Sequence, residues 1–119
     1  RDFFLVNSYS KVDIQSTIYG WIDLPHNESY YANMQSGLGD KFLEALVHAL
    51  DIVEADSSFS LAKLDYDGDG FVDIVTLIHS GYGAEWGMAD ADGQVARDRI
   101  WSHKWTLPPS MYWESSENI

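Results

Sequence analysis

The sequence predicts an α+β fold, on three observations about its hydrophobic pattern. Residues 11–21 alternate between two faces, one of which carries Val12, Ile14 and Ile18, and this is typical of a half-buried strand. Residues 71–78 form an apolar, β-branched run without Gly or Pro, which indicates a buried strand. Residues 40–53 place apolar side chains at three- and four-residue steps, as an amphipathic helix does. With 119 residues the chain has room for one core and a single domain.

Each remaining segment receives an expected structure in turn. Asp40 is the predicted N-cap of the amphipathic helix, whose buried stripe would consist of Phe42, Leu43, Leu46, Val47, Leu50 and Val53. The chain opens on apolar residues as though in mid-helix and stops without a closing element, so we expect residues 1–119 to be one partial domain of something larger. The other expectations are a helix end at 3–7, a polar loop at 26–39, a connector at 56–64, a glycine-rich turn at 79–87, a polar loop at 88–98 and a short strand or turn at 99–105.

An aspartate-rich loop at residues 65–73 is the most informative motif. Carboxylates occupy relative positions 1, 3, 5 and 9 of this loop, glycine occupies position 6, and the position-7 carbonyl can supply a further oxygen. Alternate side chains then point inward around a hard cation, whereas a merely solvated acidic turn has no need of this register. The sequence therefore predicts calcium as cofactor, with the ligands Asp65, Asp67, Asp69, Phe71 (through its carbonyl) and Asp73.

The loop departs from an ordinary EF-hand after its ninth residue. Thr76 stands at position 12, where a bidentate Glu is expected, and the residues that follow read as a strand and not as a helix. We therefore expect a calcium loop that feeds directly into a core strand. Such a site would fasten the structure together rather than sense calcium, because there is no second helix to swing open.

Charge and composition exclude several classes of function. The net charge of −12 argues against nucleic acid or an anionic membrane as partner, and no apolar run approaches the roughly 20 residues of a membrane span. The absence of cysteine excludes disulfides and thiolate metal sites. Calcium outside cells would saturate even a weak loop of this kind, and Asn27 begins an N-glycosylation triplet. These features together favour an extracellular or cell-surface location.

The histidines and one glutamate are further candidates for a metal site. His79 and His103 each end an apolar segment, and the expectation for both is a structural hydrogen bond from the ring to backbone or carboxylate. Lining a substrate cleft and binding zinc are the alternatives for this pair. Glu85 is expected to be either a second calcium ligand or a structural anchor, since a carboxylate beside Trp86 needs a partner if it is buried.

The order of five sequence blocks resembles a known family. The blocks are Asn-Ser-Tyr-Ser-Lys at 7–11, Leu-Pro-His at 24–26 with Tyr-Tyr at 30–31, the aspartate loop, His-Ser-Gly-Tyr-Gly-Ala-Glu at 79–85 and Ile-Trp-Ser-His-Lys-Trp at 100–105. Together they resemble the immune-inhibitor-A-like secreted zinc metallopeptidases. The resemblance implies a zincin-like domain in which a mixed, twisted sheet packs on helices and binds calcium. It also implies hydrolysis of peptide bonds in protein or peptide substrates by a zinc-activated water with a glutamate base.

The chain departs from this family at the catalytic signature. The family's His-Glu-x-x-His helix is absent, and in the family it follows the Trp-Ser-His block. No catalytic residue is therefore assigned here, zinc is expected in a downstream part, and the remaining half of the domain is an expected partner. Two alternatives stay open: a peptidase-like domain without activity, and a calcium hairpin of the kind found in integrin-type propellers. The single copy of the motif weighs against a propeller.

Overall fold

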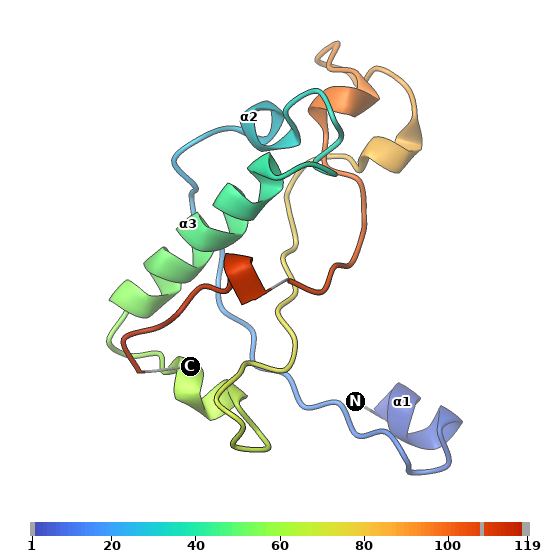
Figure 1. The fold of residues 1–119 in the computed structure, drawn as a ribbon. Helices are drawn as coiled ribbons and strands as arrows, with labels where there is room; N and C mark the ends of the chain where they lie inside the picture. Colours follow the sequence, from blue (N-terminus) through green and yellow to red (C-terminus); the bar gives the residue numbers. More distant parts are fainter. Residues whose placement is uncertain (1, 108, 118–119) are drawn as a thin grey trace.

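The computed structural model describes residues 2–107 and 109–117, and within them the regular structure is entirely helical. Three α-helices and four short 3-10 helices are joined by long extended segments (Figure 1). The α-helices are α1 (Asp2–Asn7), α2 (Glu28–Ala32) and α3 (Lys41–Ala55). The 3-10 helices are η1 (Leu61–Leu64), η2 (Ala84–Trp86), η3 (Ala96–Asp98) and η4 (Pro109–Met111).

The α3 helix confirms the amphipathic pattern at residues 40–53 and extends it by two residues. Its best-buried positions are the small residues Ala45 and Ala49, while the larger members of the predicted stripe are only partly covered. Asp40 precedes the helix as expected, but its side chain makes no capping hydrogen bond and its backbone is already helical. The helix therefore starts without the side-chain cap that the sequence suggested.

The predicted polar loop at 26–39 contains a helix that the sequence pattern did not reveal. Asn27 caps α2, because its Oδ1 accepts a hydrogen bond from the backbone N–H of Tyr30 at 3.1 Å. The helix ends at Asn33, whose backbone is left-handed. A five-residue helix has too few turns to produce a recognisable stripe, so its cap was the one available signal.

The predicted sheet is wrong for the part of the chain that the structure describes. No strand occurs in residues 2–107 or 109–117, so the mixed twisted sheet, the strands at 11–21 and 71–78 and the short strand at 99–105 are all corrected. The acidic loop leads instead into an irregular, extended segment. Ile18, Ile74 and Ile78 are 90%, 78% and 78% exposed.

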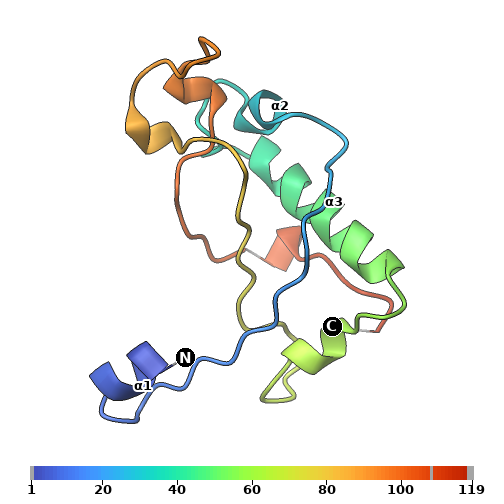
Figure 2. The ribbon, with the colours of Figure 1, turned by 180° about the vertical axis from the view of Figure 1, so that it is seen from behind.

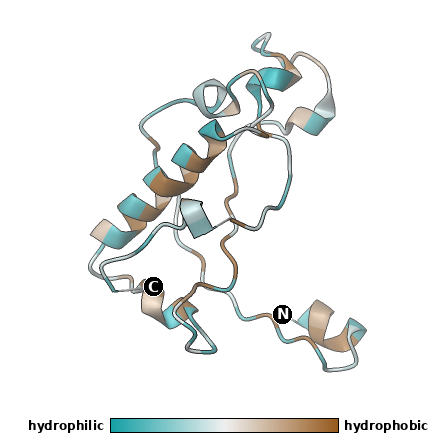
Figure 3. Cartoon of the chain, in the orientation of Figure 1, coloured by the Kyte–Doolittle hydropathy of each residue, from teal (hydrophilic) through white to brown (hydrophobic). Residues whose placement is uncertain are grey.

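The physical reason for this difference is the absence of pairing. Alternation describes the two faces of a segment, but a strand also needs a neighbour that accepts and donates its backbone hydrogen bonds. Within the described residues, neither 12–26 nor 71–82 takes part in any backbone–backbone hydrogen bond. Both segments run as long connections between the lower part of the molecule and the helices at its upper end in the two opposite views (Figures 1 and 2), and Figure 3 shows the apolar character of the later one.

The small core lies where α2 packs against α3. Tyr31, Ala32, Ala45 and Ile100 are buried together, and Leu24, Tyr30 and Phe42 pack around them. Ile100, which comes from the late part of the chain, brings residues 84–101 onto this pair of helices. The N–H of Ala84 donates to the carbonyl of Ile100 at 2.9 Å. The core therefore fixes the glycine-rich turn and the segment after it. No helix in the described residues is long and apolar enough to cross a membrane.

Candidate metal loop and polar cluster

The acidic loop brings together three of the predicted ligands. Side-chain oxygens of Asp65, Asp67 and Asp69 all lie within 4.8 Å of one another, and no other group of three metal-ligating side chains this close occurs among the described residues. Asp65 is half-buried, whereas Asp67 and Asp69 are exposed to solvent. These are positions 1, 3 and 5 of the predicted register, and their role as calcium ligands stays a prediction.

Hydrogen bonds to Asp65 hold the loop in its curved shape. Its Oδ1 accepts from the N–H groups of Gly68 at 2.8 Å and Asp69 at 3.0 Å, and its Oδ2 accepts from Gly70 at 2.9 Å. Gly70 adopts φ +87°, a conformation that side chains disfavour, so glycine at this position permits the sharp turn. The N–H of Phe71 then donates to Asp69 Oδ1 at 2.9 Å. The chain thus wraps around one carboxylate while the other two converge on the same side.

The other predicted calcium ligands lie outside this group of three. Asp73 is the last residue of the loop, and its role as a ligand stays a prediction, as does that of the Phe71 carbonyl. Glu85 sits on η2, at the opposite end of the molecule from the loop (Figures 1 and 2). The structure therefore does not bring Glu85 to the acidic loop.

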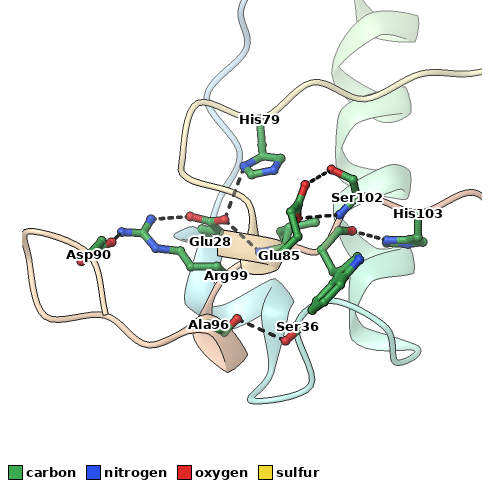
Figure 4. Close-up of polar contacts among 11 residues, drawn as sticks. Glu28, Ser36, His79, Glu85, Asp90, Ala96, Arg99, Ser102 and His103 are labelled. Carbon is green, nitrogen blue, oxygen red and sulfur yellow. Dashed lines mark hydrogen bonds and ion pairs between the residues drawn. The ribbon is translucent and has the colours of Figure 1, made fainter. Parts of the chain in front are cut away.

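Glu85 binds Ser102 in the way expected of a structural anchor (Figure 4). Its Oε1 accepts from the Ser102 hydroxyl at 2.5 Å and its Oε2 from the Ser102 N–H at 3.2 Å. These bonds, the hydroxyl one first, hold the pKa of the Glu85 carboxyl below its ordinary value of 4.5. The carboxylate thus fastens η2 to the segment that follows Trp101.

A buried polar cluster next to η2 was not predicted from the sequence. Glu28 Oε2 pairs with Arg99 Nη1 at 2.6 Å, its Oε1 accepts from the N–H of Ile100 at 3.0 Å, and the second guanidinium nitrogen of Arg99 contacts Asp90 (Figure 4). The side chains of Arg99 and Asp90 are only 12% and 4% exposed. One guanidinium thus serves two carboxylates, and it joins α2 to two later loops. Each residue lies in an ordinary polar stretch, so no local pattern indicates a pairing across 71 residues.

A cavity of about 590 Å³ opens beside this cluster. Its lining residues include Asn27, Glu28, His79, Tyr82, Gln94 and Arg99. His79 Nδ1 lies 3.4 Å from Glu28 Oε1, so His79 both contacts a carboxylate and lines a cavity.

The remaining histidines are held by neighbours within the helical part of the molecule. His103 Nδ1 is 2.5 Å from the carbonyl of Trp101, and its ring packs against Phe42 and Trp105. His48 Nδ1 is 3.0 Å from the hydroxyl of Tyr31, and His26 stacks on Tyr30. Histidine forms no group of three metal ligands among the described residues. The histidines of this chain therefore do not come together in a way that fits a zinc site.

Comparison with known proteins identifies the family. The sequence model for the immune inhibitor A peptidase M6 catalytic domain matches residues 1–117. The chain belongs to this family. The resemblance inferred from the five sequence blocks is thereby confirmed. The matching model describes a peptidase catalytic domain, and the chain is called the M6 chain below.

Two named relatives lie at low identity to this M6 chain. Immune inhibitor A of Bacillus thuringiensis subsp. alesti is 26% identical over 129 residues, which cover 94% of this chain and 18% of that protein. Pre-pro-metalloprotease PrtV of Vibrio cholerae serotype O1 is 29% identical over 122 residues, which cover 90% of this chain and 13% of that protein. The chain thus spans less than a fifth of the length of these relatives. No solved structure gives a significant match.

Proposed function

We propose that this chain is the calcium-stabilised scaffold portion of a secreted zinc-dependent endopeptidase. Membership of the M6 catalytic-domain family supports the peptidase assignment. The convergence of the Asp65, Asp67 and Asp69 carboxylates in a calcium-binding register supports the calcium and is the observation that carries the proposal. Protein or peptide chains are the proposed substrates of the whole enzyme. The enzyme would hydrolyse them with a zinc-activated water that is held elsewhere in it.

Five residues of the loop would hold calcium. The carboxylates of Asp65, Asp67, Asp69 and Asp73 would supply oxygens, and the carbonyl of Phe71 would complete the set. A bound cation offsets the mutual repulsion of these carboxylates, so the folded loop would gain stability when calcium binds. At a calcium concentration one hundred times Kd, the free energy of unfolding should rise by about 2.7 kcal/mol.

The test is a calcium titration of the chain by isothermal calorimetry, together with thermal melts in calcium and in chelator. We expect calcium to bind and raise Tm, and Asp67→Ala to lose most of this effect because it removes a ligand. Asp92→Ala is the matched control, since it removes an exposed carboxylate from a different turn. Equal calcium binding by the Asp67→Ala variant and the unaltered chain would exclude the loop as the site.

A non-catalytic, calcium-binding extracellular module is the second candidate, favoured by one observation. The sequence of this chain holds no His-Glu-x-x-His motif, so nothing within it performs the hydrolysis. Peptide cleavage by the full-length protein, abolished by a zinc chelator and restored by zinc, would support the peptidase. Calcium binding without any cleavage by the full-length protein would support the module.

An extracellular location is part of the same proposal. Asn27 is exposed, as a glycosylated residue must be, while its Oδ1 caps α2. Expression through a eukaryotic secretory pathway should give a product whose mass falls on enzymatic deglycosylation, and Asn27→Gln should remove that shift. A product of unmodified mass would show that Asn27 carries no glycan.

A further inference from the structure

The segment at residues 112–117, here called the strap, contacts the chain on both sides of the three converging carboxylates of the acidic loop. Before the loop, Glu117 Oε2 accepts from the N–H of Ala62 at 2.9 Å and from the Ser60 hydroxyl at 3.1 Å. Ala62 belongs to η1, which ends one residue before the loop begins. After the ligand cluster, the ring of Tyr112 packs on that of Phe71 with centroids 5.5 Å apart. The strap therefore meets the chain just before the three carboxylates, at Ser60 and Ala62, and just after them, at Phe71; these two places are called the flanks below.

The strap is also fastened to α3. Trp113 Nε1 donates to Asp51 Oδ1 at 2.8 Å, and the N–H of Ser116 donates to Glu54 Oε1 at 2.5 Å. Ser115 is buried, and its hydroxyl accepts from the N–H of Glu117 at 3.1 Å, so the strap turns just before its glutamate. Figure 1 shows this last part of the chain passing along the lower half of α3 to reach η1. A continuous set of contacts thus runs from α3 through the strap to both flanks of the loop.

We propose that the strap is a clasp that holds the two flanks of the acidic loop at a fixed spacing and fastens them to α3, with Glu117 as its positioning residue. Its functional effect rests on the calcium site proposed above. The loop's own hydrogen bonds, from backbone N–H groups to aspartate carboxylates, all lie within residues 65–71. They set the curvature of the loop but not where its flanks lie relative to α3. Fixing those flanks in advance lowers the conformational entropy lost on cation binding, and a preorganised loop should bind more tightly.

Charge and positioning can be separated within the strap itself. Glu117→Ala removes both a negative charge and a hydrogen-bond acceptor, whereas Glu117→Gln removes the charge and keeps an acceptor oxygen. Glu114→Ala is the matched control, because Glu114 is an exposed glutamate of the same strap for which the described structure contains no hydrogen bond or ion pair. A purely electrostatic role would weaken calcium binding similarly in all three variants.

The experiment measures calcium affinity by calorimetry and amide hydrogen exchange by mass spectrometry on the whole chain and these variants. Glu117→Ala should weaken calcium binding about fivefold, the equivalent of one hydrogen bond, while Glu117→Gln and Glu114→Ala stay within about twofold of the unaltered chain. Exchange of the Gly68 to Gly70 amides should also quicken in Glu117→Ala without calcium. Tyr112→Ala, which frees the other flank, should act in the same direction.

The outcomes divide cleanly between the two proposals. Normal calcium binding by Glu117→Ala, with unchanged exchange at the Gly68 to Gly70 amides, would overturn the clasp and leave the calcium site standing. Equal weakening by Glu117→Gln and Glu114→Ala would also overturn it, in favour of simple charge. A chain that binds no calcium at all would overturn the calcium proposal, and the exchange measurement alone would then decide whether the strap holds the loop.

Discussion

At the scale of single residues, Gly37 shows how tightly the connection between α2 and α3 is built. Its φ is +68°, and a Cβ added there would lie 2.7 Å from Cδ1 of the buried Ile100. Both facts oppose any side chain, since the backbone conformation is strained for L residues and the space is filled. Ile100 in turn belongs to the small core, so displacing it should disturb the packing of both helices.

Gly37→Ala should therefore lower the free energy of unfolding by about 1–3 kcal/mol. Denaturant unfolding followed by circular dichroism measures this change. Gly20→Ala is the control, because no atom lies within 4 Å of the added Cβ and its backbone is not left-handed, so its effect should be close to zero. Similar stabilities for the two variants would contradict the close approach of Ile100.

The Glu85 carboxylate predicts a pH dependence. Its bonds to Ser102 lower its pKa from 4.5 in the folded state, so its contribution to stability is complete above about pH 4.5 and is lost as pH falls through the lower folded value. Ser102→Ala should destabilise the chain near neutral pH, and the difference from the unaltered chain should shrink at pH 3. Thermal melts at the two pH values measure it. A difference that grows in acid would show that the bond does not favour the ionised form.

The residue scale also shows what sequence reasoning reached and where it stopped. The convergence of Asp65, Asp67 and Asp69 was predictable because the motif is local, and all the residues involved lie within nine positions. For His103 a structural hydrogen bond was the expectation, and for Glu85 a structural anchor was one of two readings beside a calcium ligand; in neither case did the sequence indicate the partner. Glu28 and Arg99 could not be paired from sequence, because no local pattern marks an ion pair that spans 71 residues.

At the scale of elements, periodicity predicted a helix well and strands badly. Fifteen residues of α3 carry enough turns for a stripe to appear, and an isolated helix satisfies its own backbone hydrogen bonds. A strand satisfies its backbone only through a neighbour, which a sequence pattern does not supply. The segments 11–21 and 71–78 have the right side-chain alternation or composition, and yet neither forms a strand within the described residues.

The polar cluster that joins α2 to the later loops gives a prediction at this scale. Arg99→Ala would leave the buried carboxylates of Glu28 and Asp90 without their shared cation, and such a loss costs about 3–5 kcal/mol. Arg97→Ala, on the same short stretch but exposed, should change stability by less than about 0.5 kcal/mol. Denaturant unfolding of both variants provides the comparison. Equal effects would mean that the cluster does not hold these elements together.

At the scale of the whole molecule, the chain is more open than a compact domain of its length. Its radius of gyration is 16.3 Å, against about 13.5 Å expected for 119 residues. Among the described residues only seven hydrophobic residues are buried, and none of the large side chains is completely enclosed. Exposed apolar side chains are numerous on the two extended segments, where Ile18, Ile74 and Ile78 are 90%, 78% and 78% exposed.

The exposure of the aromatic residues has a spectroscopic consequence. Trp21 and Trp86 are 78% and 69% exposed, Trp101 and Trp105 are 44% and 45% exposed, and Trp113 is partly covered and hydrogen-bonded to Asp51. Most of the indole emission of the folded chain should therefore already lie at the wavelength of water-exposed tryptophan and be open to quenching by iodide. Intrinsic fluorescence would change little on unfolding. The indole with a distinct signal would be that of Trp113, which lies in the strap.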